Sequence, residues 1–105
     1  MSEIEDLDLE FADLPEHAAI IETLWQEAAL ARRYGDIDPA LDAYRRIIEL
    51  DSSHSEARLA AAETCRLAGK PRDALRFCLD LLEMDRQHVG CRLELTEALR
   101  QIGQP

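Results

Sequence analysis

The sequence repeats itself at a step of 34 residues, and this repetition constrains the fold more than any other feature. The stretch 35–54 (GDIDPALDAYRRIIELDSSH) returns as 69–88 (GKPRDALRFCLDLLEMDRQH). The residues that return in phase include three glycines, an alanine pair and a histidine pair: Gly35, Gly69 and Gly103, Ala40 and Ala74, and His54 and His88. Because many positions agree in one phase, we infer that the chain repeats one structural unit of helix, turn and helix.

Each unit is expected to contain two helices, because apolar residues recur along it at helical spacing. The expected helices cover about residues 15–34, 39–50, 56–68, 71–84 and 89–102. We expect Asp38 to cap the second helix, with Pro39 as its first residue. Ser53 and Glu56 have the spacing of a capping box at the start of the third helix. Residues 15–105 are therefore predicted to be all-α.

The period and the helix lengths resemble tetratricopeptide repeats over about residues 21–103. The resemblance is supported by the small residues of the first helix and the alanine of the second: Ala28, Ala62, Ala40 and Ala74. The chain departs from the family at the early aromatic and at the closing proline, which are replaced by Leu24, Arg58 and Arg92 and by Ser52 and Arg86. The resemblance implies antiparallel helix-turn-helix repeats stacked as a short right-handed α-solenoid of five helices. It also implies a repeat at 21–54, a repeat at 55–88 and a capping helix at 89–103.

The charge of the chain is concentrated at its N-terminus. The net charge is −10, and residues 1–16 hold acids without a single base: Glu3, Glu5, Asp6, Asp8, Glu10, Asp13 and Glu16. The rest of the chain is close to neutral. Nucleic acids and anionic membranes attract clustered Lys and Arg, so neither is expected as a partner.

The three cysteines, Cys65, Cys78 and Cys91, lie among apolar neighbours and contain no CxxC pair. We therefore expect buried free thiols in a reducing compartment, and neither a disulfide framework nor a metal site. No signal peptide and no membrane-spanning stretch is apparent, so a cytoplasmic location and no membrane insertion are expected. No motif calls for a cofactor, and none predicts an enzyme.

Residues 1–14 form an acidic arm that two patterns describe. A helical stripe joins Ile4, Leu7, Phe11 and Leu14, whereas Leu7, Leu9 and Phe11 alternate as in a strand. The high charge favours a solvated tail. The alternative is an arm that folds when it docks on a protein surface.

The family resemblance implies that the first helices of successive repeats line a concave groove. A stripe of residues recurs on these helices at the same 34-residue step: Glu22, Trp25, Ala29 and Arg32, then Glu56, Leu59, Glu63 and Arg66, then Gly90, Leu93, Glu97 and Arg100. An apolar row beside an arginine row suits a peptide with apolar anchors and acidic groups. In the alternative interpretation, Glu63–Arg66 and Glu97–Arg100 are pairs within one helix that face water, and Trp25 belongs to the core.

The expected function is therefore a protein-interaction module that binds a segment of a partner protein in its groove. The alternative is self-association as a homodimer or larger assembly, through the last helix or through the arm. The residues predicted for self-association are Leu7, Leu9, Phe11, Leu14, Leu95 and Leu99. A further possibility is that the arm occupies the groove, either that of its own chain or that of a second copy.

Overall fold

The computed structural model describes residues 15–104, and within them it consists of helices and short turns without a strand. The helices are α1 (Pro15–Arg33), α2 (Ile37–Leu50), α3 (Ser55–Leu67), α4 (Pro71–Met84) and α5 (Val89–Ile102). Each begins and ends within two residues of its predicted bounds. The predictions made for the arm, residues 1–14, lie outside the described residues.

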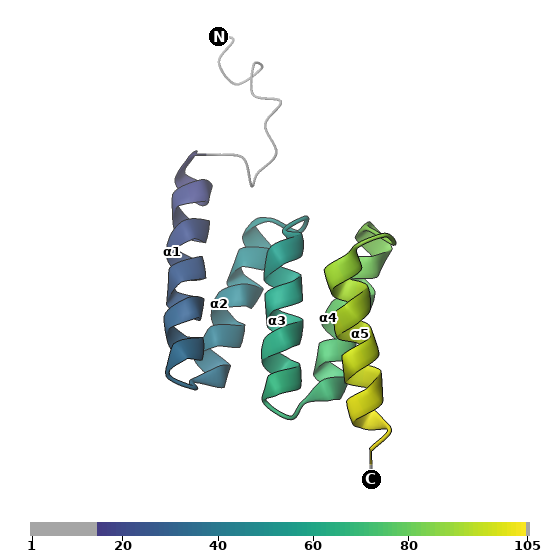
Figure 1. The fold of residues 1–105 in the computed structure, drawn as a ribbon. Helices are drawn as coiled ribbons and strands as arrows, with labels where there is room; N and C mark the ends of the chain where they lie inside the picture. The colour runs from purple at the N-terminus through teal and green to yellow at the C-terminus, as the bar shows by residue number, and fades with distance from the viewer. Residues whose placement is uncertain (1–14, 105) are drawn as a thin grey trace.

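The helices form two antiparallel hairpins and a final single helix. α1 packs on α2 and α3 packs on α4, while α2 contacts α3 and α4 contacts α5. α1, α3 and α5 form one layer, and α2 and α4 form the other (Figure 1). The predicted all-α arrangement of stacked helical repeats is thereby confirmed.

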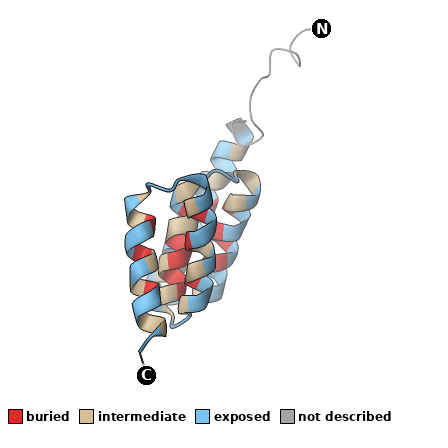
Figure 2. Ribbon diagram, turned by 90° about the vertical axis from the view of Figure 1, so that its right-hand side faces the viewer, coloured by how far each residue is buried: buried red, intermediate tan, exposed pale blue. Residues whose placement is uncertain are grey.

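The core lies between the two layers (Figure 2), and four of its alanines occupy repeat-equivalent positions. Ala28 and Ala62 on the first helices, and Ala40 and Ala74 on the second, are completely buried. Side chains this small let neighbouring helix backbones approach closely, which the dense packing of a protein interior requires. These alanines therefore determine how closely the layer of α1, α3 and α5 packs on the layer of α2 and α4.

The two turns inside the hairpins have the same geometry. Gly35 and Gly69 adopt φ values of +77° and +80°, where a side chain would be strained. In each turn the residue after glycine donates its N–H back into the preceding helix, from Asp36 to Ala31 and from Lys70 to Cys65, at 2.8 Å. The glycines recur at the 34-residue step because the turn that closes each hairpin needs a residue in the left-handed conformation.

The predicted caps of α2 and α3 were wrong. α2 begins at Ile37 with Asp36 as its N-cap, so Pro39 lies in the first turn, where its missing N–H breaks no helical hydrogen bond. Ser53 does not cap α3, because its hydroxyl donates to Asp51 Oδ1 at 2.7 Å. The cap is the neighbouring His54.

Two repeat-equivalent histidines cap the first helices of the second and third units. His54 Nδ1 accepts the Ala57 N–H at 3.0 Å, and His88 Nδ1 accepts the Cys91 N–H at 3.0 Å. Each ring thus satisfies one of the N–H groups that a helix start leaves without a partner. The repeated histidines are therefore explained by helix capping.

All three cysteines are free and buried, as predicted. Burial raises the pKa of Cys65 and Cys91, and it raises the pKa of Cys78 to about 12. The Cys91 thiol lies 3.1 Å from the Cys78 carbonyl oxygen and donates to it. The three thiols stay protonated and act as small apolar residues, and the contact between Cys78 and Cys91 joins α4 to α5.

Candidate functional site: a hollow between α1 and α3

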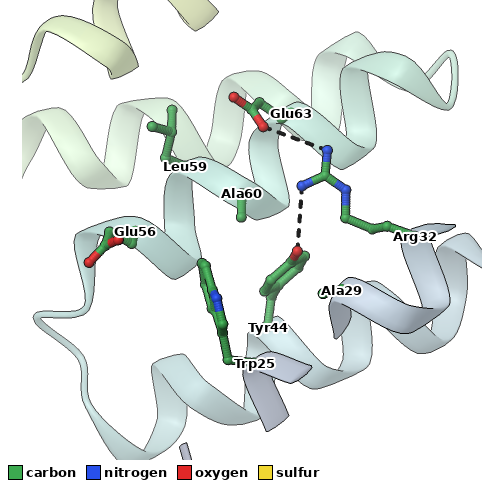
Figure 3. Close-up of a pocket in the computed structure, with 8 residues that line it drawn as sticks. All are labelled: Trp25, Ala29, Arg32, Tyr44, Glu56, Leu59, Ala60 and Glu63. Carbon is green, nitrogen blue, oxygen red and sulfur yellow. Dashed lines mark hydrogen bonds and ion pairs between the residues drawn. The ribbon is translucent and has the colours of Figure 1, made fainter. Parts of the chain in front are cut away.

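The stripe predicted from the sequence borders a hollow of about 420 Å³ between α1 and α3 (Figure 3). We call it the α1–α3 hollow. Its lining comes from α1, α2 and α3 and consists of Trp25, Ala29, Arg32, Tyr44, Glu56, Leu59, Ala60 and Glu63. The structure thus brings most of the predicted residues of the first two repeats together around one space.

The hollow exists because the repeat differs at one contact. α3 packs directly on α5, where a Cβ placed on Gly90 would lie only 3.0 Å from Leu59 Cδ2. One repeat earlier, the positions of Leu59 and Gly90 are held by the larger Trp25 and Glu56. α1 and α3 consequently approach each other less closely than α3 and α5 do, and the space between them remains open.

Trp25 forms one wall of the hollow and packs on the core at the same time. Its ring meets Tyr44 in an edge-to-face contact with centroids 5.7 Å apart, and it lies 5.8 Å from the His54 ring. Tyr44 is almost completely buried beneath it. The two interpretations of Trp25, core residue and groove residue, therefore both hold in part, and the ring is fixed in place by its neighbours.

The arginines of the stripe are all engaged by glutamates. Arg32 Nη2 lies 3.6 Å from Glu63 Oε1 on the next first helix, and its Nη1 donates to the Tyr44 hydroxyl at 3.5 Å. Arg100 pairs with Glu97 one turn earlier in α5, as predicted, and their hydrogen bond raises the pKa of Arg100 and lowers that of Glu97. The arginine row is therefore present, but its charges are already neutralised within the protein.

The predicted Glu63–Arg66 pair was wrong. Arg66 instead donates to Glu94 of α5, and this hydrogen bond raises the pKa of Arg66. The reason is geometric, because the stacking of the first helices brings Glu63 beside Arg32 and Glu94 beside Arg66. Charge pairs between helices replace the expected pair within one helix.

A second hollow of about 340 Å³ lies between α3 and α5, and we call it the α3–α5 hollow. Its lining is mostly polar and consists of Arg66, Leu67, Glu97, Arg100, Gln101 and Gln104. Three members of the predicted stripe line neither hollow: Gly90, Leu93, which is 64% exposed, and Glu22, which accepts a hydrogen bond from Gln26 at 3.0 Å. The predicted groove is thus divided into an apolar part and a polar part.

The two leucines of α5 that were predicted for self-association differ in burial. Leu95 packs against the core, whereas Leu99 is 53% exposed. Val89, the first residue of α5, is 69% exposed. The exposed apolar residues of α5 are therefore Val89, Leu93 and Leu99.

Two residues that line the α1–α3 hollow, Tyr44 and Ala60, were absent from the predicted groove. Ala60 lies on the buried side of α3, and Tyr44 belongs to α2, the second helix of its repeat. A signal for Tyr44 was present, since the equivalent position of the next repeat holds the much smaller Cys78. An aromatic residue that appears in one repeat only indicates a local difference in packing.

Neither a family model nor a curated protein sequence matches the chain. The likeness to tetratricopeptide repeats thus stays a prediction from period, helix lengths and alanine positions. No helix within residues 15–104 has the length and apolar character needed to cross a membrane. The same residues contain no group of three His, Cys, Asp or Glu side chains placed to hold a metal ion.

Proposed function

We propose that the chain is a tetratricopeptide-like adaptor that binds a segment of a partner protein on the face formed by α1, α3 and α5. The observation that carries this proposal is the α1–α3 hollow. Its size falls within the range of roughly 300–1,000 Å³ that is usual for ligand pockets. Its walls are largely apolar, and one wall is an indole ring held by its neighbours.

The build of the hollow favours binding over catalysis. Its charged side chains are one arginine and two glutamates, and Arg32 is paired with Glu63. An apolar side chain of a partner would fill the space between Trp25 and Leu59 and displace water from both, which is the usual source of affinity at protein interfaces. The three free buried thiols suit a reducing compartment such as the cytoplasm.

Ala29 provides a test of the hollow that leaves the core intact, because it is an exposed residue on the rim. Full-length protein would be used to select binders from a degenerate octapeptide library displayed on phage. We expect selected peptides to shift the emission of Trp25, the only tryptophan, and to bind Ala29→Arg at least about tenfold more weakly, since the long side chain fills the space.

The matched control is Ala19→Arg, which changes another exposed alanine of α1 that does not line the hollow. It should bind the selected peptides like the wild type. The proposal is overturned if no peptide is enriched, or if Ala29→Arg binds as tightly as Ala19→Arg.

A second candidate function, self-association, is favoured by the exposed face of α5. Leu99 is the repeat equivalent of Cys65 of α3, and the Cys65 side chain is completely buried. In α5 no described helix covers that position, and 53% of Leu99 is exposed. Sedimentation of the full chain over a range of concentrations would detect association. Leu99→Glu should abolish it, whereas Leu67→Glu, at another exposed leucine, should not; a chain that stays monomeric throughout excludes this function.

A further inference from the structure

The charges around the α1–α3 hollow are not balanced. Arg32, its only base, is engaged by Glu63 and by the Tyr44 hydroxyl. Glu56, by contrast, is exposed, and within residues 15–104 it has neither an ion pair nor a hydrogen bond from another side chain. After the internal pair is subtracted, the hollow therefore presents one uncompensated negative charge.

Glu56 lies at one end of the hollow and the Arg32–Glu63 pair lies at the other (Figure 3). Between them run the apolar walls formed by Trp25 and Leu59. A side chain with a long aliphatic stem and a cationic head matches this layout, because the stem is buried while the head stays at the wet end. The indole ring of Trp25, which lines the same hollow, offers a cation–π attraction for this head.

An acidic group fits the same space poorly. It would meet the carboxylate of Glu56, and it could reach Arg32 only by displacing Glu63. Like charges that are forced together at an interface reduce affinity and exclude wrong partners. Residues 1–14 contain acids and neither Lys nor Arg, so their composition does not match this hollow.

We infer that the segment bound in the α1–α3 hollow carries a lysine or arginine beside an apolar residue, with its cation held by Glu56 and its aliphatic stem lying between Trp25 and Leu59. This inference rests on the proposed binding function. It replaces the acidic peptide that the arginine row suggested. Glu56 also lies in the first turn of α3, where its negative charge interacts favourably with the helix dipole. The stability of any variant at this position must therefore be measured as well.

The test repeats the selection of displayed octapeptides with the full-length wild type and three variants. Sequences selected by the wild type should be enriched in Lys or Arg next to an apolar residue. The most enriched peptide, made synthetically, should bind Glu56→Gln about two- to fivefold more weakly, as expected for an ion pair open to solvent. Glu56→Lys should select Asp or Glu in place of Lys or Arg.

The matched control is Glu83→Gln, at an exposed glutamate of α4 away from the hollow, which should bind like the wild type. Circular dichroism and urea unfolding would establish that each variant is folded. Failure of the wild type to enrich any sequence overturns the binding function and this inference together. Enrichment of apolar sequences without Lys or Arg, or equal binding by Glu56→Gln and wild type, overturns the inference alone.

Discussion

Arg66 of α3 donates its Nε–H to the carboxylate of Glu94 of α5, and this ion pair ties together the first helices of two successive hairpins. The Glu94 side chain is 6% exposed and that of Arg66 24%. Glu94 is the repeat equivalent of Ala60, so the pair is a departure from the repeat. An acid at this buried position needs a partner, and Arg66 supplies it.

Loss of this pair should destabilise the fold. Arg66→Ala leaves the Glu94 carboxylate buried without its partner, and we expect the free energy of unfolding to fall by about 2–3 kcal/mol, toward the low end for a buried pair because Arg66 is partly exposed. Glu94→Gln keeps an acceptor for Arg66 and should cost less, about 1 kcal/mol. Urea unfolding followed by circular dichroism measures both.

Arg100→Ala is the matched control, since its pair with Glu97 is exposed and lies within one helix. It should lower the unfolding free energy far less than Arg66→Ala does, because solvent screens an exposed pair. Equal effects of Arg66→Ala and Arg100→Ala would contradict a stabilising role for the buried pair.

Replacing either capping histidine should destabilise the fold. His88→Ala should cost about 1 kcal/mol, the usual loss when a helix cap is removed. His54→Ala should cost more, because the His54 ring also contacts Trp25. Asn at either position restores an acceptor for the helix N–H and should recover most of the loss at position 88, but less at position 54. Thermal unfolding of the four variants checks this order; identical losses in His54→Ala and His88→Ala would show that the ring contact contributes nothing.

The fold could be predicted from the sequence because its determinants recur. The glycines that close the hairpins and two pairs of buried alanines, Ala28 with Ala62 and Ala40 with Ala74, recur at the same step, so each position supports the interpretation of its equivalent. The caps were harder to predict. Ser53 and Glu56 have the right spacing, but Asp51 engages the serine hydroxyl and leaves the cap to His54. Which of several adjacent polar groups accepts a given N–H depends on turn geometry that the sequence does not state.

The candidate site could be predicted only as a face. Helical spacing placed Trp25, Leu59 and the arginines on one side, but it could not place one helix against the next. The partner of Arg66 depends on how closely α3 and α5 approach, and that depends on the absence of a side chain at Gly90. The arginine row was expected to face the acids of a partner, whereas each of its arginines is paired with a glutamate of the same chain.

Alkaline pH should weaken the fold through Cys78. Burial raises the pKa of this thiol from an ordinary 9.0 to about 12, so above pH 9 the unfolded chain loses a proton that the folded chain keeps. The folded state is then disfavoured as pH rises, by up to about 1.4 kcal/mol per pH unit. Urea unfolding between pH 8 and about pH 11 measures the slope.

Cys78→Ala separates this thiol from the other groups that titrate at high pH. The variant loses packing at every pH, so its stability starts lower, but the slope of stability against pH should be shallower than in the wild type. Parallel slopes in the two proteins would mean that Cys78 is not the group responsible.

Gly90 sets how closely α5 lies against α3, and this gives the last prediction. Alanine favours a helix over glycine by up to about 1 kcal/mol, but its Cβ would lie 3.0 Å from Leu59 Cδ2. In the wild-type background Gly90→Ala should therefore stabilise little, because Leu59 must shift toward the α1–α3 hollow. In a Leu59→Ala background the contact is gone, and the same substitution should stabilise by about 1 kcal/mol relative to Leu59→Ala alone. A double-mutant cycle by urea unfolding measures the difference. If Gly90→Ala has the same effect in both backgrounds, the contact between α3 and α5 does not depend on the absence of a side chain at Gly90. The explanation given for the α1–α3 hollow would then be wrong.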